Sequence, residues 1–140
     1  MIRSWMRVMA VCVALGGAFA SAPAAAHSFS EQGSYTLTLY AVKGTPYDSD
    51  APFHRIASGT LRCGPDGGSH RAPRAACDDL RSANGFIDLV PEASGPCSSE
   101  NAPVYAVAEG RWKGEPRLFG KVFSNRCIAV RSTGGAVFRI

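Results

Sequence analysis

The clearest periodic pattern in the chain is a strict alternation of apolar and polar residues over positions 35–42. A tyrosine, two leucines and an alanine fall on one face of the extended chain there, and two threonines lie on the other face. A period of two over eight residues is typical of a strand with one buried face. The sequence therefore predicts a strand over 35–42, a loop containing Gly and Pro over 43–53, and a weaker strand over 55–63.

A helical pattern follows the turn that the Gly- and Pro-rich segment 64–68 must form. Beyond Ser69, apolar residues recur at spacings of one, four and seven, namely Ala76, Cys77, Leu80 and Ala83. Pro73 is suited to the first turn of a helix, and Asn84-Gly85 supplies a stop signal. We therefore expect one helix between about 69 and 83.

The remaining segments complete an α+β pattern. Two strand-like runs at 104–108 and 117–123 flank a turn at 112–114, and the segment 136–140 alternates as a closing strand. The short apolar segment 86–90 is compatible with a strand or with irregular structure. About five strands with one inserted helix favour an α+β fold with a mostly antiparallel sheet, and we expect one or two helices packed on it.

The beginning of the chain has the three parts of a secretory signal peptide. Its basic, apolar and small-residue parts are, in order, Arg3 with Arg7, residues 8–19, and Ala24-Ala25-Ala26. The apolar part is shorter than a membrane-spanning helix, although a retained amphipathic anchor is an alternative. We expect residues 1–26 to be removed, residues 27–34 to form a flexible tail, and one domain over 35–140 to be secreted without a membrane anchor.

Charge and composition argue against several classes of function. Loss of Arg3 and Arg7 leaves 13 basic side chains against 11 acidic ones. The arginines are scattered along the chain without interleaved aromatic residues, so nucleic-acid binding is not supported. The sequence has no Gly-x-Ser-x-Gly motif and no phosphate-binding loop. It also has no Cys/His nucleophile pair, because every cysteine of the mature chain is needed for a disulfide. We therefore expect neither an enzyme nor a cofactor.

Cysteine usage indicates an oxidised, exported domain. After Cys12 is removed with the signal peptide, four cysteines remain, namely Cys63, Cys77, Cys97 and Cys127. Two disulfides are the natural interpretation for a small exported domain. Zinc is the alternative, but the chain has no Cys-x-x-Cys pair and its histidines are not spaced as ligands. Residue spacing alone leaves three connectivities open, and we expect no metal site.

A short polar loop lies between a cysteine and the strand that begins at Val104. It reads Pro96-Cys97-Ser98-Ser99-Glu100-Asn101-Ala102-Pro103. If Cys97 pairs with Cys127, the loop is tied to the sheet beside its most exposed residues. A chain held in this way presents a rigid, extended peptide, which is the kind of peptide that a protease grips.

Several short motifs follow one another along the expected domain. They are Thr60-Leu61-x-Cys63, Ala76-Cys77-x-Asp79-Leu80, Cys97 with Pro103-Val104, Glu109-Gly110-x-Trp112-x-Gly114, Val122-Phe123-Ser124-Asn125-x-Cys127 and Ala136-Val137-Phe138. Together they resemble the Streptomyces subtilisin inhibitor family from Tyr35 to the end of the chain. Both cysteine separations fit that family, and we expect the sequential disulfides Cys63–Cys77 and Cys97–Cys127.

The resemblance implies a fold, an assembly and a function. Members of the family have a five-stranded antiparallel sheet covered by helices and form homodimers that pack sheet to sheet. They are exported inhibitors of subtilisin-like serine proteases, so the implied partner is an extracellular protease. The family's reactive bond lies two residues after the cysteine of the second disulfide, which places P1 at Ser99 and P1′ at Glu100. Asn125 matches an asparagine that braces the loop, although an ordinary turn residue is the alternative.

The loop departs from the family at the two positions before the reactive bond. The family usually carries proline at P2 and Met, Lys or Arg at P1, whereas this chain has Ser98 and Ser99. Serine buries less apolar area in a specificity pocket, and the loss of proline loosens the backbone. Two hypotheses follow: an inhibitor of a subtilisin-like or small-P1-preferring protease, and a secreted interaction module that does not inhibit.

Other polar and aromatic residues of the domain are expected to have structural roles. His70 is expected at a helix start, and His54 in a surface loop. Asp78 and Asp79 are expected on a solvated helix face, and Trp112 is expected to pack at a hairpin.

Overall fold

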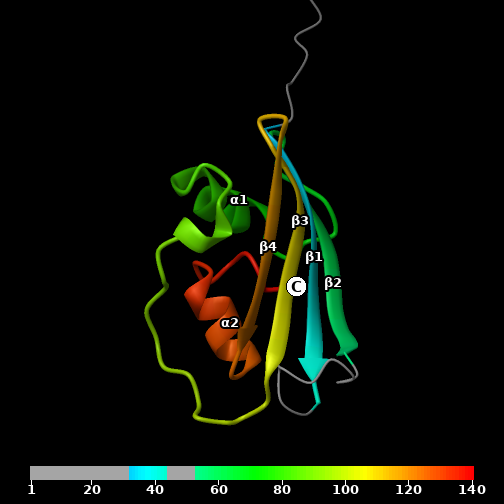
Figure 1. Ribbon diagram of the computed structural model, residues 1–140. Coiled ribbons are helices and arrows are strands. Elements are labelled where there is room, and N and C mark those ends of the chain that lie inside the picture. Colours follow the sequence, from blue (N-terminus) through cyan, green and yellow to red (C-terminus); the bar gives the residue numbers. More distant parts are fainter. Residues whose placement is uncertain (1–31, 44–52) are drawn as a thin grey trace, which may run out of the picture.

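The computed structural model describes residues 32–43 and 53–140. Its helices and strands are β1 (Gly33–Val42), β2 (Phe53–Cys63), α1 (Pro73–Ser82), the 3-10 helix η1 (Ile87–Leu89), β3 (Val104–Trp112), β4 (Glu115–Phe123) and α2 (Arg126–Ser132). The strands form one antiparallel sheet in the order β2-β1-β3-β4, and both α-helices cover the same face (Figure 1). Among the described residues, no helix is long and apolar enough to cross a membrane.

The expected signal peptide, residues 1–26, lies outside the described residues, as does most of the expected tail. The last positions of that tail belong to the sheet, because β1 begins at Gly33. The Gln32 N–H also donates to Cys63 O at 2.7 Å. The sheet therefore begins two residues earlier than the alternation predicted.

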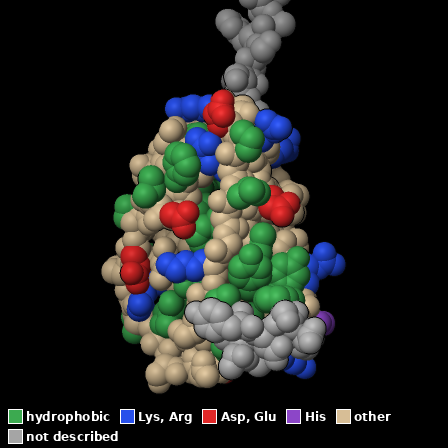
Figure 2. All heavy atoms as spheres, in the orientation of Figure 1, with side chains coloured by type: hydrophobic (Ala, Val, Ile, Leu, Met, Phe, Trp, Pro, Cys, Tyr) green, Lys and Arg blue, Asp and Glu red, His purple; other side chains and the backbone are tan. Residues whose placement is uncertain are grey.

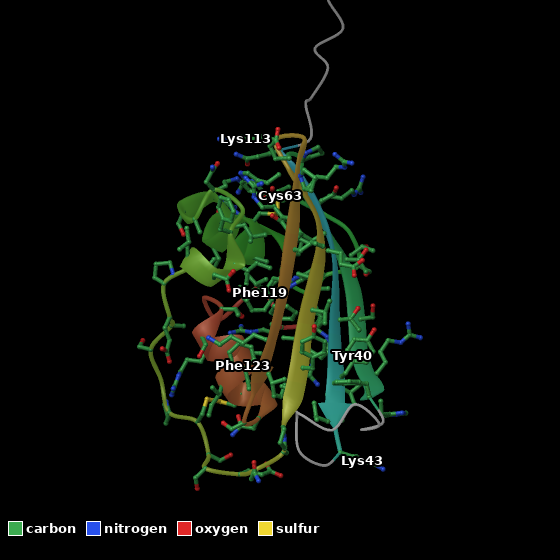
Figure 3. All side chains as sticks on the ribbon, in the orientation of Figure 1. Tyr40, Lys43, Cys63, Lys113, Phe119 and Phe123 are labelled. Atoms are coloured by element: carbon green, nitrogen blue, oxygen red, sulfur yellow. A yellow bond between two sulfur atoms is a disulfide. The ribbon has the colours of Figure 1, made fainter. Side chains whose placement is uncertain are left out.

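The alternation over 35–42 places β1 at the centre of the sheet with one face buried. Tyr35, Leu37 and Leu39 are buried against the helices, while the residues between them are more exposed. From β4, Phe119 and Phe123 reach the same core (Figure 3). Burying one face of a strand under helices removes apolar area from water, which is the main force holding this sheet and its helices together.

Within the part of the chain that the structure describes, the sheet has four strands, and the prediction of five was wrong. The segment 136–140, expected to close the sheet, instead contains a turn in which the Arg139 N–H donates to Ala136 O at 2.9 Å. Three successive residues, 136–138, are buried, because this segment is enclosed by other parts of the core rather than exposed on one face. A partner for its backbone comes from a side chain: His70 Nε2 lies 3.0 Å from Val137 O.

The remaining elements differ from the sequence predictions mainly in their bounds. The helix α1 begins at Pro73 rather than near 69, and the ambiguous segment 86–90 contains the 3-10 helix η1. The strands β3 and β4 extend to the hairpin turn, where Lys113 and Gly114 have positive φ angles of 50° and 82°. Trp112 is 1% exposed beside this turn, as expected for a packed residue.

Both expected disulfides are present. Cys63–Cys77 joins the end of β2 to α1, with a Cα–Cα distance of 5.6 Å. Cys97–Cys127 joins the polar loop to α2, with a Cα–Cα distance of 5.7 Å. The sequential connectivity is therefore confirmed.

Asp79 is more enclosed than a residue on a solvated helix face. Within the described residues, its Oδ2 is buried without a hydrogen-bond partner. Burial raises the pKa of the Asp79 carboxyl above its usual value, and a hydrogen bond from the Ala136 backbone partly opposes this rise. Its neighbour Asp78 is exposed, and an Asp78 Oδ1 accepts from Arg81 at 2.8 Å.

We expect Asp79→Asn to increase the free energy of unfolding at neutral pH, on the order of 1 kcal/mol, because a buried charge is replaced by a neutral amide. The folded-state pKa is raised, so ionised Asp79 destabilises the protein above that pKa and the penalty disappears as the pH falls through it. Denaturant unfolding at pH 7 and at about pH 3 measures this change. Asp78→Asn is the control and should give no gain. An Asp79→Asn gain that does not shrink on acidification would contradict the explanation.

Candidate functional site

The polar loop 96–103 connects the second disulfide to the beginning of β3 without regular secondary structure. Its exposed residues are Pro96, Ser98, Ser99, Glu100, Asn101 and Ala102. In Figure 1 the yellow-green chain passes outside α2 and turns beyond the end of the sheet to reach β3. The loop is therefore accessible to another protein over most of its length.

Asn125 holds two carbonyl groups of this loop. Its Nδ2 donates to Ser98 O and to Glu100 O, each at 3.0 Å, so the residues before and after Ser99 are both fixed. Its Oδ1 accepts from the Ile128 N–H at 2.9 Å, which caps the first turn of α2. Asn125 is 4% exposed, so its side chain is shielded from water and these contacts are partly buried. The side chain thus has the geometry of a brace and of a helix cap at once.

Backbone contacts hold the second half of the loop. The Ala102 N–H donates to Ser124 O at 3.0 Å, and the Val42 N–H donates to Pro103 O at 3.0 Å. The first half is held by the Cys97–Cys127 disulfide. The peptide bond between Ser99 and Glu100 therefore lies between two anchored segments of chain.

The position of a second helix was not predicted, although this helix, α2, carries much of the support. It has seven residues, too few for an apolar period to be recognised. The available signal was Asn125, since asparagine is a favoured helix cap. Sequence reasoning likewise did not single out Arg131, whose Nε donates to Glu92 Oε1 at 2.8 Å.

We expect Asn125→Ala to lower the free energy of unfolding by about 1–3 kcal/mol, because a helix cap and two partly buried hydrogen bonds are lost. Asn125→Asp separates the two roles, since a carboxylate still caps α2 but cannot donate to Ser98 O or Glu100 O. Hydrogen exchange of the Ala102 amide, whose N–H donates to Ser124 O, should therefore increase in both variants. The exposed Asn101→Ala is the control for a simple change in the loop. Unchanged exchange in Asn125→Asp would contradict the bracing role.

A second exposed feature is an apolar patch on the face of the sheet that the helices leave open (Figure 2). The rings of Tyr40, Phe53 and Tyr105 cluster there, with the centroids of Phe53 and Tyr105 5.5 Å apart. On the neighbouring strand β4, Leu118 is 79% exposed and Val122 is 37% exposed. Exposed apolar clusters of this kind are typical of protein interfaces.

Comparison with known protein families finds a match over most of the described chain. A family model described as subtilisin inhibitor-like matches residues 32–125. A trypsin inhibitor, STI2, from Streptomyces longisporus is 34% identical over 131 residues, covering 92% of this chain and 88% of the relative. A subtilase-type protease inhibitor from Streptomyces coelicolor is 36% identical over 121 residues, covering 85% of this chain and 81% of the relative.

Comparison with solved structures finds the same kind of protein. The chain is similar to Streptomyces caespitosus sermetstatin, whose crystal structure contains a complex with Bacillus licheniformis subtilisin. The TM-score is 0.57 at 26% identity, and the alignment covers 77% of this chain and 98% of that chain. The similarity therefore extends over nearly all of that protein.

Proposed function

This chain belongs to the subtilisin inhibitor-like family, and we propose that it is itself an inhibitor of subtilisin-like serine proteases with its reactive bond at Ser99–Glu100. The observation that carries the assignment of the bond is Asn125, which holds Ser98 O and Glu100 O on either side of it. Similar proteins are described as protease inhibitors, and one was solved in complex with a subtilisin. The chain acts on its partner by binding it and is not an enzyme.

The braced loop suits tight binding because little of its freedom is left to lose. Ser98 and Glu100 are fixed by Asn125, and Cys97 is fixed by its disulfide before any protease arrives. Ordering a loose loop on binding costs free energy, and pre-organisation removes much of that cost. Main-chain pairing with the protease would add hydrogen bonds, while the Ser99 side chain enters the specificity pocket.

The same contacts would let the protease cut the bond and reseal it. The catalytic serine of the protease attacks the Ser99 carbonyl, the C–N bond to Glu100 breaks, and the new amine takes up a proton from the catalytic histidine. On one side Ser99 stays attached near Cys97, and on the other Glu100 stays on Asn125. The amine therefore remains close to the acyl-enzyme, so religation competes with hydrolysis.

The residues at the reactive bond favour a target with a small specificity pocket. Ser99 offers little apolar area, and Glu100 places an exposed carboxylate at P1′. Relatives are described as inhibitors of trypsin and of subtilases, so closely similar chains serve proteases of different specificity. A subtilisin-like protease that accepts small P1 residues and tolerates an acidic P1′ residue is the proposed partner.

Titration of a subtilisin and of a protease that prefers small P1 residues tests this proposal. We expect a linear, stoichiometric loss of activity with at least one of them at micromolar protein. Ser99→Pro should abolish the effect, because proline cannot adopt the extended pairing that the protease requires. Full protease activity at every protein concentration, with the protein folded, would favour the alternative of a secreted module that does not inhibit.

We propose that the mature protein is secreted after cleavage following Ala26. The supporting observation is the basic, apolar and small-residue order of residues 1–26. Amino-terminal sequencing of the exported protein should begin at His27, and retention of residues 1–26 would contradict the proposal.

We also propose a homodimer that packs through the open face of the sheet. The exposed Leu118 and Val122, together with the Tyr40–Phe53–Tyr105 cluster, support it. Sedimentation should give a dimer mass, and replacing Leu118 and Val122 by glutamate should give a monomer. A monomeric natural protein would contradict the proposal.

A further inference from the structure

We propose that Arg131 is a positioning residue of the reactive loop, acting through the chain segment 92–96 that leads into Cys97. This inference rests on the proposed function. It identifies a further support of the loop, distinct from Asn125 and from the disulfide. If Arg131 has this role, the position of Ser99, on the acyl side of the reactive bond, depends on an arginine at the far end of α2.

Arg131 makes three contacts with the approach segment. Its Nε donates to Glu92 Oε1 at 2.8 Å, and its Nη1 donates to Gly95 O at 3.2 Å. Its own backbone carbonyl accepts from the Ala93 N–H at 2.9 Å. A guanidinium can hold a carboxylate and a carbonyl in a fixed relative position because its donors lie in one rigid plane.

The approach segment needs such contacts because it packs poorly against the core. A cavity of about 440 Å³ lies beside it, and its lining includes Ala93, Pro96 and Val130. At Gly95 the φ angle is +121°, and among the described residues no atom outside Gly95 and its two chain neighbours lies within 4 Å of where a Cβ would stand. With so little packing, the path of the segment is set mainly by its polar contacts and by the disulfide at its end.

All of the supports on this side of the loop converge on one short helix. Asn125 caps α2, Cys127 lies in its first turn, and Arg131 lies near its end. They hold, in order, the carbonyls beside Ser99, the start of the loop, and the segment 92–95. The helix α2 therefore acts as a common rigid frame, and the position of Ser99 depends on attachments at both of its ends.

The contribution of Arg131 to global stability is expected to be small. The Arg131 side chain is 32% exposed and that of Glu92 is 54% exposed, and exposed ion pairs stabilise proteins little. A comparable arrangement elsewhere provides a control, because Arg81 on α1 pairs with Asp66 and Asp78 away from the loop. The positional and the stabilising effects can therefore be separated.

The first test needs no protease. In free Arg131→Ala, the Ala93 amide, whose N–H donates to Arg131 O, should exchange hydrogen roughly tenfold faster than in the natural protein, because the segment that carries it is no longer held by the Arg131 side chain. Amides of β1 should keep their rates. Arg131→Lys should give an intermediate effect, since an ammonium keeps the charge but loses the planar fork. Arg81→Ala should leave exchange of the Ala93 amide unchanged. Equal rates in Arg131→Ala and the natural protein would overturn the proposal.

The second test measures hydrolysis of Ser99–Glu100 in the complex with the protease that the natural protein inhibits. Arg131→Ala should be turned over roughly three- to tenfold faster, and Arg81→Ala at the natural rate, although both variants have similar melting temperatures. Equal acceleration in the two variants would assign the effect to stability and overturn the proposal. If the natural protein inhibits no protease, the proposed function fails, and the exchange test still decides the role of Arg131.

Discussion

Replacing Cys97 and Cys127 together by serine is expected to turn the inhibitor into a substrate. The disulfide anchors the chain two residues before the reactive bond, and without it the segment carrying Ser99 can leave the active site after cleavage. The variant should also lose about 3–4 kcal/mol of stability in the chain-entropy description, given a separation of 30 residues. Inhibition should become transient, and cleaved protein should accumulate, as followed by residual protease activity and intact mass.

The other disulfide supplies the matched control. Replacing Cys63 and Cys77 by serine removes a cross-link between β2 and α1, away from the loop. Its separation of 14 residues corresponds to a similar loss, about 3 kcal/mol. Inhibition by the two variants should be compared at a temperature where circular dichroism shows that both are folded, so that unfolding does not account for a difference. Equal loss of lasting inhibition in the two variants would contradict the role assigned to Cys97–Cys127.

Ser99→Met is expected to tighten binding to subtilisin by roughly 5- to 30-fold. A methionine in the specificity pocket buries more apolar area than a serine, which is worth about 1–2 kcal/mol at the usual rate per unit area. Ser99 is exposed in the free protein, so the fold should tolerate the change. Inhibition constants from progress curves at fixed protease concentration measure the gain.

A matched substitution separates this effect from a general increase in surface apolarity. Ser82 is exposed at the end of α1, away from the loop 96–103 and its supports, and Ser82→Met should leave the inhibition constant unchanged. A protease with a small pocket should respond in the opposite direction and bind Ser99→Met less tightly. Equal affinity of the natural protein and Ser99→Met for subtilisin would mean that Ser99 does not occupy the specificity pocket.

Alternation and local stop signals were sufficient to predict much of the sheet. In β1, one face is buried under helices and the other is open, so the polar pattern of 35–42 reports the structure directly. The same reasoning was wrong for 136–140, where the apolar residues serve a buried turn and three successive positions are enclosed. Alternation over five residues does not distinguish a strand from an enclosed chain end.

The loop was located by its cysteine and its polar residues, but its supports depend on tertiary contacts. Asn125 approaches Ser98 and Glu100 only because the β3–β4 hairpin returns the chain beneath the loop. The contact between Arg131 and Glu92 joins residues 39 positions apart through a helix too short to predict. Such contacts carry no local periodicity, and the structure was required to find them.

Incubation of the mature protein with a catalytic amount of an inhibited protease, followed by intact mass and amino-terminal sequencing, tests whether Ser99–Glu100 is the reactive bond. We expect one cut, between Ser99 and Glu100, with the fragments still joined through Cys97–Cys127. We also expect a stable mixture of cut and intact protein that is reached from either starting form. Cleavage at another bond, or complete degradation without such a mixture, would show that this loop does not act as a substrate-like inhibitor.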